Sequence, residues 1–301
     1  MSGVQLTSLL RAVQGRTVPG PPQPVVPAPQ SASSGPRDVG TLVERAVAAG
    51  APAAVAAHLA EAVADLDERE RGQVVEPLRP APGTDVLRFG TAAARQVDET
   101  ACGAAVLTLL AAEGDPTVAH WLVTGRDLDG YRSPLLRDVA DAPGVAGRLT
   151  ALQLALHVRS TRRAVLGVAP WPTALGTPPW GAARTACFPG VRYRAFWVDD
   201  TRPDELGAVL ALARQALGHG LPVPVYTGGD TSRGLAAALP RHVVLLTAAD
   251  ERGLHVYEPS GARLHVLPDA DLLDPGVPRA AYGHWSHVTA VLLPRPGTEP
   301  R

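Results

Sequence analysis

The chain has 301 residues, a formal net charge of −1 and 46% apolar residues, so it is long enough for one or two domains with a sizeable core. All 28 basic residues are arginine, and lysine, asparagine and isoleucine are absent. Without lysine the chain cannot contain a Walker phosphate loop, a Schiff-base lysine or a Ser–Lys hydrolase site. The balanced charge argues against a nucleic-acid or anionic-membrane surface.

The chain shows no targeting or membrane signal. No apolar run reaches the roughly 18 residues of a membrane span, and residues 1–16 lack the basic start and apolar stretch of a signal peptide. We therefore expect a cytoplasmic protein with no membrane contact. The two cysteines, Cys102 and Cys187, are too few for a disulfide scaffold or a thiolate zinc site.

Residues 1–38 are predicted to form a short amphipathic helix, over about 4–15, and then a proline-rich linker. Docking of this tail on its own domain, or plain disorder, is favoured over contact with a partner, which stays open. Residues 39–80 form a predicted helical segment. One helix stops at Gly50, and a second starts at Pro52 and gives way to an exposed charged run at 67–71.

Residues 85–295 are predicted to form the main domain, in which helices precede strands. A short strand is expected at 86–89 and a helix at 99–112, which has no polar face and should be buried. Helices near 144–160 and 203–218 flank an aromatic-rich stretch, 165–200, that we expect to be irregular. Strands are predicted at 221–226, 243–247, 254–257, 263–267 and 288–293. This order indicates an α+β fold with an antiparallel sheet.

The predicted buried helix carries Cys102 in its first turn, where the helix dipole favours a thiolate. Asp98 or Thr100 is the expected N-cap of this helix. Gln96 lies in the loop that leads into this helix. If the loop folds back, its side-chain amide can donate to an oxyanion beside the backbone N–H of Cys102. The pattern indicates a nucleophilic cysteine with an oxyanion site.

A nucleophilic cysteine needs a base, and His242 opens a predicted strand far downstream. Residues 250–253 predict a hairpin turn that places Glu258 opposite position 243, beside His242. Cross-strand neighbours lie about 5 Å apart, within reach of a carboxylate–imidazole hydrogen bond. The spacing therefore predicts His242 as the base and Glu258 as the acid that orients it.

Gln96, the Cys102-Gly103 pair, His242 at a strand start and the Glu258-Pro259 pair together resemble the papain-like cysteine peptidases. More narrowly, they resemble the bacterial family related to bacteriocin double-glycine leader peptidases, over roughly residues 85–295. The resemblance implies Cys102 as nucleophile, His242 as base, Glu258 as orienting acid and Gln96 as oxyanion donor. It also implies a papain-like fold, in which a helical lobe led by the cysteine helix packs against an antiparallel sheet.

The sequence departs from this family in two ways. The acid before proline is usually Asp, whereas here it is Glu258, and the chain carries no transporter segment. The leader-processing role of transporter-fused relatives is therefore not implied. The expected function is a thiol hydrolase that cleaves a peptide or amide bond in a peptide or protein substrate and uses no cofactor. A non-catalytic peptide-binding protein of the same fold and an acyltransferase that uses the same cysteine remain open.

Other candidate residues favour structural roles. His284 and His287 invite a metal interpretation, but positions three apart on a strand face opposite sides, so we expect no metal. His287 remains an alternative base. Cys187 lacks any Gln or Cys-Gly motif, so we expect it to be structural. The glycine-rich segment 228–234 is expected to be a mobile loop near the cleft.

Overall fold

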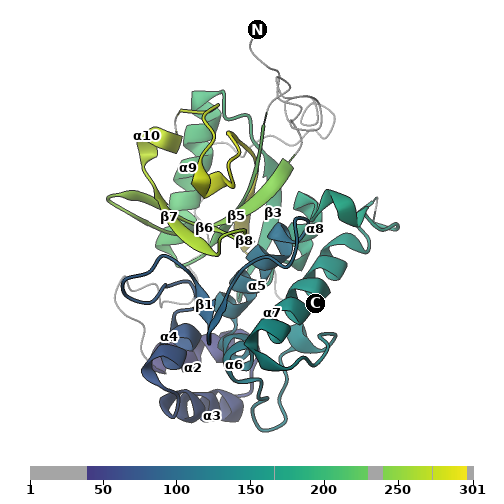
Figure 1. Cartoon of the computed structure of the whole chain (residues 1–301), viewed down its shortest axis with the longest axis vertical. Coiled ribbons are helices and arrows are strands. Elements are labelled where there is room, and N and C mark those ends of the chain that lie inside the picture. Colours follow the sequence, from purple (N-terminus) through teal and green to yellow (C-terminus); the bar gives the residue numbers. More distant parts are fainter. Residues whose placement is uncertain (1–38, 166, 230–239, 273, 297–301) are drawn as a thin grey trace.

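The computed structural model describes residues 39–165, 167–229, 240–272 and 274–296. It has a helical half and a half built on an antiparallel sheet (Figure 1), which confirms the α+β class. The N-terminal helix and linker predicted for residues 1–38 lie outside the described residues, and so does most of the loop predicted at 228–234.

Nine helices occur in the described residues: α2 Val39–Ala48, α3 Ala53–Ala64, α4 Glu68–Val75, α5 Cys102–Gly114, α6 Pro116–Thr124, α7 Gly144–Thr161, α8 Pro179–Thr185, α9 Pro203–Gly218 and α10 Asp269–Leu272. Short 3-10 turns lie at Pro134–Leu136, Thr173–Leu175 and Ala280–Tyr282. The helices predicted near 144–160 and 203–218 are confirmed by α7 and α9. None of these helices combines the length and the apolar content needed to cross a bilayer.

The charged run at 67–71 is largely exposed, as predicted, but it is not a helix end: Glu68–Arg71 form the first turn of a new helix, α4. The Asp67 carboxylate accepts the N–H of Glu70 at 2.7 Å and thereby starts α4. The helix then buries Val74 and Val75. The cap and the two valines outweigh the low apolar content of the rest of the segment.

The prediction that 165–200 is irregular is also wrong in part, because α8 and strand β3 lie within it. In β3 the side chains of Val191 and Tyr193 are buried while those of Arg192 and Arg194 are exposed. This period of two is the strand signal that sequence reasoning missed among the surrounding prolines and glycines.

The main sheet has six antiparallel strands, in the order β3 Val191–Trp197, β8 His287–Pro296, β4 Val223–Gly228, β5 Pro240–Asp250, β6 Gly253–Glu258 and β7 Arg263–Leu267. A separate hairpin pairs β1 Arg88–Phe89 with β2 Ala92–Ala93. The strands predicted after residue 220 are all confirmed. Since β5, β6 and β7 form a meander, the start of β5 lies near the end of β6.

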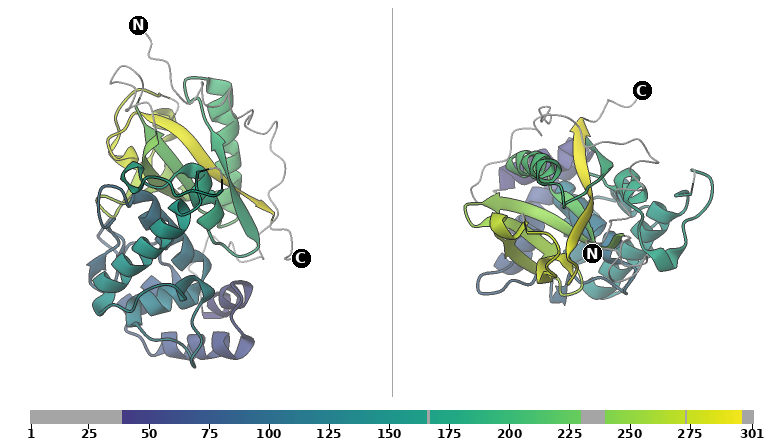
Figure 2. Two further views of the ribbon diagram at one scale, coloured as in Figure 1. Left: turned by 90° about the vertical axis from the view of Figure 1, so that its right-hand side faces the viewer. Right: turned by 90° about the horizontal axis from the view of Figure 1, so that it is seen from above.

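Helices cover both faces of the sheet. Val225 and Leu246 line a small apolar cavity with residues of α9, whereas the neighbouring Tyr226 and Val243 line a cavity beside the start of α5. Figure 2 shows α9 alongside the sheet, away from the helical half. Burial of both faces explains why β4 has no exposed residue.

Helix α5 lies between the sheet and the other helices of its half (Figure 1), and every one of its residues is buried. It packs against β5 on one side and against α6 and α7 on the other. This position explains why the segment has no polar face, and it carries the first residue of α5, Cys102, to the boundary between helices and sheet.

Replacing Leu110 of α5 with alanine should lower the free energy of unfolding by about 2–5 kcal/mol, because the side chain is fully buried and leaves a cavity. Leu154→Ala on α7, where the side chain is 50% exposed, is the matched control and should change it by less than about 0.5 kcal/mol. Urea unfolding followed by circular dichroism measures both. Similar losses in the two variants would contradict the central position of α5.

Candidate active site

Cys102 is the first residue of α5, and the preceding N-cap, Ala101, makes no side-chain capping hydrogen bond. The prediction of Asp98 or Thr100 as N-cap is therefore wrong. The Asp98 carboxylate instead accepts the N–H of Thr100 at 2.8 Å and its hydroxyl at 2.7 Å, which makes a turn before the helix. No side chain caps α5. The N–H groups of its first turn and the positive end of its dipole therefore lie next to Cys102.

His242 lies near the start of β5 and donates from Nε2 to Oε1 of Glu258, at the end of β6, at 2.8 Å. The two residues are only 7% and 6% exposed. Near the turn, where Asp250 pairs with Gly253, the register differs by two positions from the expected pairing. The irregularity between Leu246 and Ala248 reduces this difference to one position, so that Tyr257 pairs with Leu245. The side chains of His242 and Glu258 meet despite this shift.

The Glu258 carboxylate is held by the turn that follows it. Oε1 also accepts the N–H of Ser260 at 2.8 Å, and Oε2 accepts the N–H of Gly261 at 2.8 Å. The intervening Pro259 has no N–H to compete, so the longer glutamate side chain folds back over its own turn. Burial on its own raises the pKa of Glu258, but the hydrogen bonds from His242, Ser260 and Gly261 outweigh it and lower the pKa to about 2.

The electrostatics of His242 follow from its two partners. Burial alone lowers the pKa of the ring, but hydrogen bonding to Cys102 and Glu258 and the negative charge of both outweigh it and raise the pKa to about 9. Because Nε2 is bonded to Glu258, the other ring nitrogen, Nδ1, is left for the thiol. The arrangement favours a protonated, positively charged His242 ring beside Cys102 at neutral pH.

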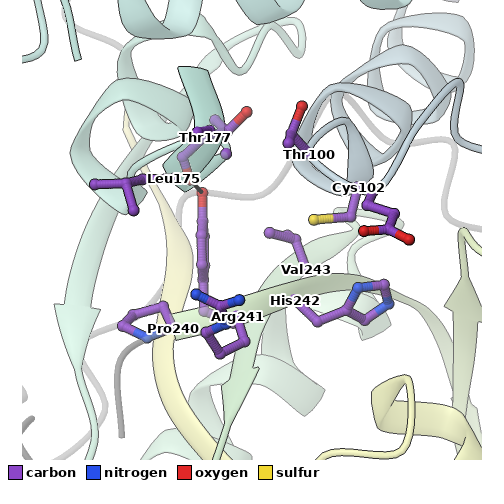
Figure 3. Close-up of a pocket in the computed structure, with 12 residues that line it drawn as sticks. Thr100, Cys102, Leu175, Thr177, Pro240, Arg241, His242 and Val243 are labelled. Atoms are coloured by element: carbon purple, nitrogen blue, oxygen red, sulfur yellow. Dashed lines mark hydrogen bonds between the residues drawn. The ribbon is translucent and has the colours of Figure 1, made fainter. Parts of the chain in front are cut away.

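A narrow cavity of about 50 Å³ joins Cys102 and His242 to the segment 174–177, the side chain of Tyr226 and the rim residues Glu99 and Arg241. Figure 3 shows Cys102 at the end of its helix, above the strand that carries His242, with the sulfur directed into the cavity. The thiol and the histidine thus share one small space between helices and sheet. Thr177, Tyr226 and the rim charges were not identified from the sequence.

Gln96 lies in the loop before α5 and is tied to the acid turn. Its N–H donates to the Pro259 carbonyl at 3.0 Å, and its Oε1 accepts the Ser260 hydroxyl at 3.3 Å. Its Nε2 donates to the Asp98 carbonyl at 2.7 Å, and the same carbonyl accepts the N–H of Ala101. The amide that was predicted to stabilise an oxyanion is therefore close to the residue before Cys102.

The other predicted candidates lie elsewhere. His287 is buried on β8, where its Nδ1 contacts Asp200 at 3.0 Å, and Cys187 is an exposed free thiol. In the described part of the chain no group of three or more His, Cys, Asp or Glu side chains could hold a metal ion.

Gly283 packs directly on the His242 ring and was not identified from the sequence. A Cβ at this position would lie 2.4 Å from a ring carbon of His242, and the residue has a φ of +65° that favours glycine. Glycine has no functional group, so only the positive φ and the small size of Gly283 indicate its role.

No protein-family model and no curated protein sequence matches the chain. Among solved structures, it is similar to a double-glycine motif protease from an AMS/PCAT transporter, solved in complex with the leader peptide. The match has 12% sequence identity and a TM-score of 0.31, and it covers 67% of this chain and 89% of the other.

Gly283→Ala should displace the His242 ring, because the added methyl group cannot fit against it, and should slow alkylation of Cys102 by iodoacetamide by about tenfold or more. Gly276→Ala is the matched control, since Gly276 also has a positive φ (+95°) but nothing within 4 Å of an added Cβ. Both variants carry the backbone strain, and only the first touches His242. Equal alkylation rates in the two variants would contradict the packing role.

NMR titration should show His242 with a pKa of about 9, and Glu258→Gln should lower it, because a neutral amide replaces the carboxylate. The buried His120 of α6, whose pKa burial lowers to about 4, is the internal control and should not change. The raised histidine pKa contributes stability that is lost as the pH rises from 6.5 to 9, and the lowered glutamate pKa contributes stability that is lost as the pH falls from 4.5 to 2. The stability difference between wild type and variant should therefore be largest between about pH 4.5 and 6.5. A His242 pKa that stays the same in Glu258→Gln would rule out this coupling.

Proposed function

We propose that the protein is a thiol hydrolase of papain-like fold that cleaves a peptide or amide bond through Cys102, His242 and Glu258. One arrangement carries the proposal: a buried histidine bonds a buried carboxylate at 2.8 Å and meets, from its other side, a cysteine at an uncapped helix N-terminus. Such surroundings stabilise a thiolate beside an imidazolium, which is the reactive form of a cysteine nucleophile.

In the proposed mechanism the Cys102 thiolate attacks the carbonyl carbon, and the carbonyl oxygen takes up the electron pair as an oxyanion. The N–H of Cys102 and the amide of Gln96 stabilise that charge. Collapse breaks the C–N bond, and the amine leaves with a proton from His242. Water then attacks the thioester while His242 takes its proton, so that the acid is released and the thiolate is restored.

A peptide or protein chain is the proposed substrate. The cavity at Cys102 is narrow and opens between the 174–177 segment and the start of β5, which suits an extended main chain better than a bulky rigid ligand. Every step above uses side chains of this protein, so the proposal includes no cofactor. If an amine attacked the thioester in place of water, the same site would be an acyltransferase, and analysis of the acyl product would identify it.

Iodoacetamide at pH 6 tests the proposal. An ordinary thiol with a pKa near 8.5 is less than about 1% thiolate at this pH. Cys102 should therefore be alkylated at least about tenfold faster than the cysteines of the urea-unfolded protein, and faster still than Cys187, whose pKa is raised by desolvation. His242→Ala should abolish this difference because it removes the cation beside the sulfur. Peptide mass spectrometry measures the rate at each cysteine.

His255→Ala is the matched control, since His255 lies in the same hairpin and also contacts a carboxylate, Asp250, at 2.9 Å. This variant should leave the alkylation of Cys102 unchanged. Alkylation of Cys102 no faster than that of Cys187 would overturn the hydrolase proposal and favour a non-catalytic peptide-binding protein.

A further inference from the structure

Gln153 is a buried amide in the middle of α7, and it is only 2% exposed. It lies among the apolar side chains Leu149, Leu152 and Leu156, which pack this face of the helix into the core. Burying a side-chain amide in such surroundings is unfavourable unless both of its ends are hydrogen-bonded. The hydrogen-bond partners of this amide therefore indicate its structural role.

Both ends of the Gln153 amide bond the main chain on either side of Gln96. Oε1 accepts the N–H of Val97 at 3.0 Å, and Nε2 donates to the carbonyl of Arg95 at 2.9 Å. In an extended segment these two groups point to the same side, and a neighbouring strand would normally pair with them. Gln153 thus takes the place of a strand neighbour and fixes the peptide units around Gln96.

The opposite side of the same segment is also fixed. The N–H of Gln96 points away from α7 and donates to the carbonyl of Pro259, next to Glu258. With both sides of the backbone fixed, the side chain of Gln96 reaches the Asp98 carbonyl, which also accepts the N–H of Ala101. The hydrogen bonds from α7 therefore determine where the Gln96 amide lies relative to Cys102.

We propose that Gln153 is a positioning residue for the oxyanion site: it holds the Gln96 backbone so that the Gln96 amide stays at the N-terminus of α5. This inference rests on the proposed function and deepens it. Gln153 itself touches no reacting atom. It follows that removing Gln153 impairs reactions that pass through an oxyanion and spares the reactivity of the thiolate.

Two probes of Cys102 separate these effects. p-Nitrophenyl acetate acylates the sulfur: the thiolate forms a C–S bond, an oxyanion develops, and the C–O bond breaks as nitrophenolate leaves with the electron pair. Iodoacetamide alkylates the same sulfur by displacement of iodide, and no oxyanion forms. The first rate is measured by nitrophenolate absorbance and by acetylation of Cys102, and the second by mass spectrometry.

Gln153→Leu should slow acylation by about tenfold or more, toward the 10²- to 10³-fold loss that removal of an oxyanion donor causes, with alkylation changed by less than about twofold. The double variant Gln96→Ala/Gln153→Leu should acylate no more slowly than Gln96→Ala alone, because both changes act through one amide. Gln153→Glu should lose activity at neutral pH and regain part of it as the pH falls, since a protonated carboxyl can again donate to Arg95.

Gln73→Leu is the matched control. Gln73 also bonds a backbone N–H and a backbone carbonyl, both of Gly90, but it lies away from the site. This variant should lower stability and leave acylation unchanged. Wild-type acylation in Gln153→Leu, parallel loss of alkylation, or multiplied losses in the double variant would each overturn the inference. These outcomes can be distinguished from failure of the hydrolase proposal itself, in which wild-type Cys102 would be alkylated no faster than Cys187.

Discussion

The buried contact between His242 and Glu258 is the interaction on which the site depends. Removing a charged imidazolium and a carboxylate from water costs several kcal/mol for each ion, and only good geometry and further hydrogen bonds compensate for it. The carboxylate accepts three hydrogen bonds, from His242, Ser260 and Gly261. The pair is therefore stable only if the β5–β6 hairpin, the turn after Glu258 and the contact with Gly283 are all correctly formed.

The cysteine side of the site is built onto the same structure. The hydroxyl of Tyr257, on β6, donates to the carbonyl of Ala94, and the Pro259 carbonyl accepts the N–H of Gln96. The loop that leads into α5 is thus bonded to the strand and the turn that hold the acid. Because α5 packs against β5, Cys102, His242 and Gln96 are positioned by contacts between the same few elements.

Sequence reasoning could identify candidate residues whose side-chain chemistry is visible in the sequence. Cys102 opens an apolar helix a few residues after Gln96. The hairpin between His242 and Glu258 is short enough for the pairing at their end of it to be inferred within one position. The contribution of Gly283 could not be found in this way, because it lies far along the chain and acts only by being small. Gln153 was missed for a related reason: on α7 it looks like any polar helix residue, and only the fold shows that its side chain replaces a strand neighbour.

The group that bonds His242 is a carboxylate, and this has a physical consequence. The chain contains no asparagine, so a neutral amide of that kind cannot orient His242, and a glutamate does so. A carboxylate stabilises the imidazolium more strongly than an amide, which contributes to the raised pKa of His242 and extends the ion-paired state toward alkaline pH. The same charge is unfavourable when buried unless it is fully hydrogen-bonded. The Glu258-Pro259-Ser260-Gly261 turn meets that requirement with two backbone N–H groups, so the identity of the acid and the shape of the turn after it depend on each other.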